Sequence, residues 1–202
     1  RADEGDALSP EMEAAGDEAA QQFMDFMHSL VEERRTSPRD DLLSRLVGLQ
    51  REAGTALSDA DIVSTALLLF QAGHETTANM ISKGALALIR HPEQLRRLHE
   101  CPELAENAVE ELLRFDTPVQ MSTKFAASEI PFHDRTILKD DPVIFFWGAV
   151  NRDPARYVDP DRLDISRDDI DHHSFGLGAH FCLGASLARL EIQEAVGALV
   201  AR

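Results

Sequence analysis

A long stretch without proline constrains the fold of this chain more than any other feature. No proline occurs between Pro38 and Pro92, and apolar residues recur along most of the second half of that stretch. Ser58 has Asp61 three residues later, which is the pattern of a helix N-cap. We predict one helix over Asp59–Arg90, about 48 Å long at 1.5 Å per residue. A helix of that length crosses a whole domain, so much of its surface is expected to be buried.

The rest of the sequence predicts further helices and a minor sheet, so the expected fold class is mainly α with a small β-sheet. Four further helical segments are expected at Glu11 up to the break at Thr36–Pro38, at Asp41–Arg51, from His91–Glu93 onward and at Glu103–Phe115. The last helix is expected at Leu187–Val200, the short strands within Val119–Ile130 and Val143–Trp147, and a long irregular loop at Asn151–Asp171.

Composition excludes several classes of partner. The chain has 202 residues with 20 Lys+Arg and 36 Asp+Glu, a formal net charge of −16. Because nucleic acids and anionic membranes bind basic surfaces, neither is an expected partner. The longest uncharged apolar run, Ile62–Phe70, is far shorter than the ~20 residues of a membrane helix. The polar start RADEGDALSP does not resemble a signal peptide, and two cysteines are too few for a disulfide framework. We therefore expect a cytoplasmic protein.

The segment Phe175–Gly184, FGLGAHFCLG, carries the most chemistry. Its three glycines permit positive φ and close approach of the backbone to a ligand. Cys182 stands just before the last predicted helix, where the helix dipole and free N–H groups favour a thiolate. Zinc is excluded on ligand count, with one Cys and one nearby His. A buried structural cysteine and the nucleophile of a cysteine-dependent hydrolase or thiol redox protein remain open alternatives.

Six residues of this segment match the signature F-G-x-G-x-H-x-C-x-G. By average residue usage such a match arises by chance roughly once in 10⁸ windows. The chain therefore resembles the cytochrome P450 family, of the bacterial type. The matching residues are Phe175, Gly176, Gly178, His180, Cys182 and Gly184.

The resemblance implies a role for most of these residues. Cys182 would be the axial thiolate ligand of the iron in haem b, and N–H groups near it would tune the potential. His180 would reach a haem propionate, and Phe175 would pack beside the thiolate. Gly176 belongs to the same haem-binding turn, and Gly184 would let the last helix approach the porphyrin.

The long helix carries a second motif, Ala72-Gly-His-Glu-Thr-Thr77. Taken alone, its glycine is a packing glycine in a crowded helix. Beside the cysteine loop, it resembles the family's A-G-x-[DE]-T motif, in which Ala72 and Gly73 border a groove for dioxygen where the helix opens locally. Splitting dioxygen takes two protons, so Thr76 would be the catalytic alcohol and Glu75 the acid that resupplies the proton. The neighbouring His74 and Thr77 are expected to be structural.

Two further matches concern the scaffold. Glu111 and Arg114 form an E-x-x-R motif and share one helix face at i, i+3. Asp159–Leu163 resembles the family's P-E-R-F element, which implies that Arg162 completes a buried Glu–Arg–Arg network. Lys124 stands where the family has an arginine that binds a haem propionate; it keeps the charge but loses the planar fork.

The resemblance covers essentially the whole chain, whereas family members are about twice as long. It implies part of a single domain, with a helical lead-in at 1–57, the distal helix at 58–90, the E-x-x-R helix, sheet and meander at 91–171, and the haem-binding loop and last helix at 172–202. The implied function is a haem-thiolate monooxygenase that uses O2 to hydroxylate a small organic substrate, with electrons from a ferredoxin and its reductase. The alternative is a truncated, non-catalytic chain that binds haem weakly or not at all.

Overall fold

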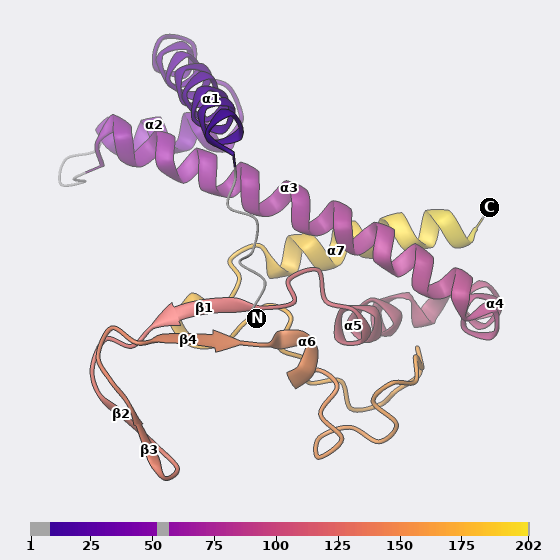
Figure 1. The fold of residues 1–202 in the computed structure, drawn as a ribbon. Coiled ribbons are helices and arrows are strands. Elements are labelled where there is room, and N and C mark those ends of the chain that lie inside the picture. The colour runs from indigo at the N-terminus through magenta and orange to yellow at the C-terminus, as the bar shows by residue number, and fades with distance from the viewer. Residues whose placement is uncertain (1–8, 52–56, 202) are drawn as a thin grey trace. The chain divides into compact units, whose positions relative to one another are not determined.

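A computed structural model describes residues 9–51 and 57–201 and shows a mainly helical chain with two small antiparallel sheets (Figure 1). The predicted fold class is therefore confirmed. Among the described residues, no helix combines the length and apolar character needed to cross a membrane. The elements are α1 Pro10–Thr36, α2 Leu42–Arg51, α3 Asp59–Arg90, α4 Pro92–Glu100, the 3-10 turn η1 Pro102–Leu104, α5 Ala105–Phe115, β1 Ser122–Phe125, β2 Ile130–Phe132, β3 Arg135–Ile137, β4 Pro142–Phe145, α6 Trp147–Val150, the 3-10 turn η2 Gly178–His180 and α7 Ala185–Val200.

The predicted long helix is confirmed at both ends. The structure has α3 over Asp59–Arg90, as the sequence indicates. The Asp61 N–H donates to the Ser58 hydroxyl at 3.2 Å, and the Ser58 N–H donates back to the Asp61 carboxylate at 2.8 Å. These two bonds satisfy donors that the first helical turn leaves unpaired.

The chain divides into two compact units, with the boundary between Ala72 and Gly73 inside α3. The first unit contains α1, α2 and the start of α3, packed around a small apolar core. Ser9 caps α1 by accepting a hydrogen bond from the Met12 N–H at 3.2 Å, and Pro10 occupies the first turn, where its missing N–H costs nothing. The core residues of this unit are Met27, Val31, Val47, Ile62 and Val63.

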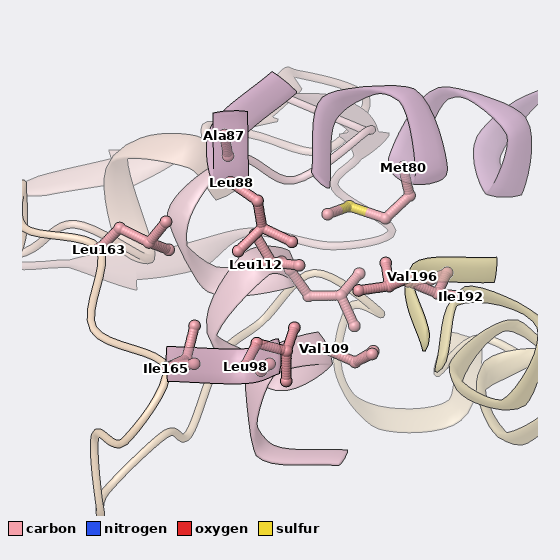
Figure 2. Packing of buried hydrophobic residues seen from close by; sticks show 12 residues of the cluster. Met80, Ala87, Leu88, Leu98, Val109, Leu112, Leu163, Ile165, Ile192 and Val196 are labelled. Carbon is pink, nitrogen blue, oxygen red and sulfur yellow. The ribbon is translucent and has the colours of Figure 1, made fainter. Parts of the chain in front are cut away.

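The second unit has its core between the C-terminal part of α3, helices α4, α5 and α7, and the irregular segment after α6 (Figure 2). Met80 of α3, Leu112 of α5 and Val196 of α7 meet there. A Cβ atom at Gly84 would lie 3.3 Å from Leu112 Cδ1 and 3.9 Å from Val196 Cγ2. The missing side chain at Gly84 therefore lets α3 approach α5 and α7 closely.

The strands are shorter than the sequence indicates. β1 pairs with β4 in antiparallel register, Ser122 opposite Phe145, and β2 with β3 forms a separate two-stranded hairpin. The expected strand at Val143–Trp147 ends at Phe145, because Trp147 already begins α6. The expected strand within 119–130 is interrupted at Ala126, whose N–H and C=O pair with the turn at 140–141 instead.

Two helix starts also differ from the expectation. The segment expected to be helical from Glu103 opens as the 3-10 turn η1, and α5 begins at Ala105. The last helix begins at Ala185, two residues earlier than the expected Leu187. This earlier start brings Cys182 to within three residues of the helix.

Candidate functional site

The loop that carries Cys182 joins the irregular segment to α7 and has a defined backbone. Gly176 and Gly178 have φ of +72° and +69°, the left-handed region that glycine enters without steric cost. The Cys182 N–H donates to the Phe175 carbonyl at 2.9 Å, which closes the loop across its ends. Gly184 has φ of −86°, so it does not use the positive φ that a glycine permits.

Cys182 is exposed at the start of α7. In the described part of the chain, the N–H groups of Leu183 and Gly184, which follow it, donate to no protein acceptor. Free backbone donors and the N-terminus of α7 thus directly follow the cysteine in the chain. The predicted setting of the thiol is therefore present.

Phe175 opens this loop and is held by residues that sequence reasoning missed. The Arg189 guanidinium lies 4.5 Å from the centroid of the Phe175 ring, and the His172 ring lies 5.7 Å from it. Arg189 of α7 donates two hydrogen bonds to Glu110 of α5, at 2.7 and 3.0 Å. His172 lies within hydrogen-bonding distance of the same carboxylate, at 3.1 Å.

These contacts set the charge state of Glu110. Burial by itself would raise the pKa of this carboxyl group, but hydrogen bonds and charge from His172 and Arg189 outweigh it and lower the pKa to about 2. Glu110 therefore stays ionised and keeps α7 attached to α5 beside the cysteine loop.

The E-x-x-R pair forms as expected and lies in the core of the second unit. The side chains of Glu111 and Arg114 are both 0% exposed. Arg114 Nε and Nη2 donate to the two oxygens of Glu111 at 2.7 and 2.9 Å. Its Nη1 donates to the carbonyls of Asn151 and Pro160 at 3.0 and 2.8 Å. One guanidinium thus joins α5 to two points of the irregular segment.

The prediction that the Arg162 side chain completes this network is wrong. Its side chain is 64% exposed and lies 3.6 Å from Asp164, while only its backbone carbonyl accepts a bond from Arg114 at 3.2 Å. The second guanidinium on Glu111 belongs to Arg167, whose Nε is 3.2 Å from the carboxylate and whose side chain is 13% exposed. The turn at 159–162, closed by the Arg162 N–H on the Asp159 carbonyl, directs Arg162 away from Glu111.

Tyr157 is a further residue that the sequence did not single out. Its ring centroid lies 5.2 Å from the guanidinium of Arg114 and 5.1 Å from that of Arg156. Its hydroxyl donates to the Asp171 carbonyl at 2.8 Å. The signal available in the sequence was an aromatic residue within the polar segment Asn151–Asp171.

The distal motif lies on a regular part of α3. The expected local opening is absent, because the structure is α-helical through every residue of 59–90. Glu75 is exposed, Thr76 half-buried and Thr77 buried. A Cβ atom at Gly73 would meet nothing within 4 Å, so this glycine is not required by packing. Ala72 belongs to the first unit.

Residues 73–77 of the distal motif and the cysteine loop lie towards the same end of a pair of helices, which residues 73–90 of α3 form with α7. Residues 73–90 of α3 and helix α7 run in the same direction (Figure 1) and meet at Gly84 and Val196. Thr76 lies two turns before Gly84 on α3, and Cys182 precedes α7. Parallel helices in contact therefore carry both motifs towards the same end of the pair.

The two residues expected near haem propionates lie in exposed segments. Lys124 is on β1 with its ammonium 5.8 Å from the centroid of the Phe145 ring. His180 ends the 3-10 turn η2 inside the cysteine loop. Among the described residues, Lys124 forms neither an ion pair nor a side-chain hydrogen bond with that loop.

Comparison with known proteins identifies the family. The cytochrome P450 family model matches residues 6–101 and 103–202. The chain belongs to the cytochrome P450 family. It is 42% identical over 196 residues to cytochrome P450 CYP107DY1 of Priestia megaterium, covering 97% of this chain and 48% of that one. It is 41% identical over 195 residues to 6-deoxyerythronolide B hydroxylase of Saccharopolyspora erythraea, covering 96% and 48%.

The structural comparison agrees. The crystal structure of P450BioI, solved with an acyl carrier protein bearing hexadec-9Z-enoic acid, matches with a TM-score of 0.89 at 41% identity. The match covers 96% of this chain and 50% of that one. The chain thus has part of the cytochrome P450 fold and spans about half the length of the curated relatives it matches.

The residues around Cys182 fit a haem group. Among the described residues no cluster of three His, Cys, Asp or Glu side chains could hold a metal ion, whereas haem iron needs only one axial ligand from this loop. Cβ atoms at Gly178 and Gly184 would meet nothing within 4 Å, so the backbone is open to a flat ligand there. The apolar side chains of Leu177, Phe181 and Leu183 are exposed on the same loop.

The assignment of the network to Arg167 predicts a difference between two nearby arginines. Arg167→Ala should lower the free energy of unfolding by about 1–3 kcal/mol, because it removes one of two guanidinium groups from a buried carboxylate. Arg162→Ala should change it by less than about 0.5 kcal/mol, because the side chain is exposed. Urea unfolding followed by circular dichroism measures both. A larger effect at Arg162 would restore the original assignment.

The environment of Glu110 predicts a pH dependence. Its folded pKa lies below its ordinary value of 4.5, so its contribution to stability is present above pH 4.5 and is lost as the pH falls towards about 2. Glu110→Gln should flatten the loss of stability in that window, by ~1 kcal/mol after solvent screening. Urea midpoints measured at intervals between pH 5 and the acid limit of folding test this. Parallel curves for the two proteins would contradict it.

Proposed function

We propose that the chain is the haem-binding part of a haem-thiolate monooxygenase that inserts one oxygen atom of O2 into a small organic substrate. The observation that carries this proposal is the exposed Cys182 thiol at the start of α7, in a glycine-rich loop closed by its own backbone. Membership of the cytochrome P450 family supports a role for that thiol as the ligand of haem iron.

Several residues of the chain would each contribute to binding haem b. Cys182 would supply the thiolate that binds the iron, and the N–H groups of Leu183 and Gly184 would stabilise the charge of that thiolate. Gly176 and Gly184 keep side chains away from the bound porphyrin, and Phe175 shields the sulfur. His180 and Lys124 are the proposed partners of the propionates, since both side chains carry N–H donors on exposed segments.

Residues of α3 would deliver protons to the dioxygen that the enzyme consumes. Haem, when bound, supplies the reductive activation of dioxygen. The Thr76 hydroxyl donates a hydrogen bond to dioxygen or holds a water there, and the exposed Glu75 carboxyl group resupplies the proton from solvent. Gly73, with no neighbour within 4 Å of a Cβ, leaves space beside this turn, and Ala72 completes the motif.

The scaffold contributes by holding the loop. Glu111, Arg114 and Arg167 attach the irregular segment to α5, with the Arg162 carbonyl as one acceptor. Because the haem ligand follows that segment in sequence, its position depends on this network.

The family and the composition support a proposal for the source of electrons and for the location. We propose a ferredoxin and its reductase as electron donors, as the resemblance implies for a bacterial-type member. Both cysteines, Cys101 and Cys182, are free thiols, which supports a reducing, cytoplasmic location.

Reconstitution tests the proposal. Haemin added to the 202-residue chain, then reduced under carbon monoxide, should give the red-shifted Soret band typical of thiolate ligation. Cys182→Ser should abolish that band because the ligand is lost, whereas Cys101→Ser should keep it. Cys101→Ser is the matched control, because it makes the same substitution at the other free thiol.

The opposite outcome favours the alternative. No band, or a histidine-type band, would indicate a chain that does not hold haem as a thiolate complex without the rest of the domain. The observation in favour of that alternative is that the chain spans about half the length of its relatives. Pure protein without iron that loses a thiol-dependent activity in Cys182→Ser would instead point to a hydrolase or redox protein.

The proton relay is tested with two neighbouring threonines. In the haemin-loaded chain, Thr76→Val should leave the carbon monoxide spectrum unchanged but raise the hydrogen peroxide released per electron consumed severalfold, because proton delivery is impaired. Thr77→Val makes the same substitution at the neighbouring buried threonine and should not change that ratio. Equal coupling in the two variants would remove Thr76 from the relay.

A further inference from the structure

Asn151 is a fully buried polar residue to which the proposed function gives no role. It follows α6 and is 0% exposed. A buried amide side chain is stable only when its donors and acceptor are hydrogen-bonded. The partners of Asn151 therefore indicate what the residue holds in place.

Three of the four polar groups of Asn151 link Arg114 to the segment before the cysteine loop, and the fourth caps α6. Its carbonyl accepts from Arg114 Nη1 at 3.0 Å. Its side-chain Oδ1 accepts from the His173 N–H at 2.8 Å, and its Nδ2 donates to the Ser174 hydroxyl at 2.9 Å. Its own N–H donates to the Trp147 carbonyl at 2.9 Å.

The Ser174 hydroxyl fixes the direction of these bonds. It donates its only proton to the Leu113 carbonyl at 2.8 Å, so it must accept from Asn151. The amide of Asn151 therefore has one permitted orientation, with its oxygen towards His173 and its nitrogen towards Ser174. Leucine, of similar size, cannot make either bond.

The segment that Asn151 holds supplies the two carbonyls that shape the cysteine loop. The His173 carbonyl accepts from the Gly176 N–H at 2.9 Å, which forms the first turn of the loop. The Phe175 carbonyl accepts from the Cys182 N–H at 2.9 Å. A shift of residues 173–175 would therefore move the backbone of the cysteine directly.

We propose that Asn151, acting through Ser174, is a positioning residue for Cys182: it transmits the fixed position of Arg114 to the loop that presents the thiol. The role of that thiol as a haem ligand rests on the proposed function. The hydrogen-bonded path from Arg114 to the Cys182 amide does not depend on haem.

Asn107 is a matched control. It is half-buried on α5, and its Nδ2 donates to the Ile165 and Arg167 carbonyls at 2.8 and 3.2 Å. It thus fastens the same irregular segment to the same helix, and in the described part of the chain its side chain forms no hydrogen bond with residues 173–175. Asn→Leu at either position removes two side-chain hydrogen bonds. At Asn151 the lost partners are His173 and Ser174, whereas at Asn107 they are Ile165 and Arg167.

The first experiment measures amide hydrogen exchange by NMR in the full 202-residue chain without haem. Asn151→Leu should speed exchange of the Cys182 and Gly176 amides by at least about tenfold, because the loop loses its fixed carbonyls. The Leu112 amide in the core of α5 should be much less affected. Asn107→Leu should leave the Cys182 amide within about threefold of the parent chain.

Two outcomes would overturn the proposal. One is an unchanged Cys182 amide in a folded Asn151→Leu chain. The other is an equal acceleration at Cys182 and at Leu112, which would assign Asn151 to general stability alone. If Asn151→Leu does not fold, Ser174→Ala decides by the same comparison, since it removes a single hydroxyl.

The second experiment adds haemin and carbon monoxide. The fraction of haem with the thiolate-type Soret band should fall in Asn151→Leu relative to Asn107→Leu, and an equal fraction would contradict a positioning role. If the parent chain shows no thiolate band, the proposed function fails for this chain, and the exchange experiment alone decides whether Asn151 positions the loop.

Discussion

The buried ion pair between Glu111 and Arg114 is the contact on which the second unit depends. Both side chains are fully buried, and a charge in that position is tolerated only when it is paired and its remaining polar atoms are hydrogen-bonded. Arg114 meets this requirement with the backbone carbonyls of Asn151, Pro160 and Arg162. The irregular segment must therefore keep its carbonyls where the guanidinium can reach them, which ties a loop without regular structure to α5.

Side chains of neighbouring helices hydrogen-bond further backbone groups of that segment in the same way. The Ile165 N–H donates to Gln94 of α4 at 3.0 Å, and its carbonyl accepts from Asn107 of α5 at 2.8 Å. The Asp164 N–H donates to Glu111 at 2.9 Å. Side chains of helices thus supply the hydrogen bonds that a sheet would otherwise provide, so the segment is ordered without being regular.

Local patterns in the sequence predicted the features that local interactions determine. The bounds of α3 follow from a cap and the absence of proline, and the Glu111–Arg114 pair follows from helix spacing. The choice between Arg162 and Arg167 could not be read in this way, because it depends on how the turn at 159–162 directs each side chain. The roles of Asn151 and Arg189 were missed for a similar reason: their partners lie 22 and 79 residues away in sequence.

Helix α5 connects the two parts of the candidate site, which are residues 73–90 of α3 and the cysteine loop. Its apolar face contacts α3 and α7 through Leu112, close to Gly84 (Figure 2). Its polar residues hold the irregular segment through Glu111 and Arg114, and its Leu113 carbonyl receives the Ser174 hydroxyl. The cysteine loop is thus attached to the same helix that supports residues 73–90 of α3. The thiol is exposed, but the hydrogen bond from Ser174 to the Leu113 carbonyl attaches the start of its loop to α5. The position of a ligand at Cys182 would therefore depend on α5.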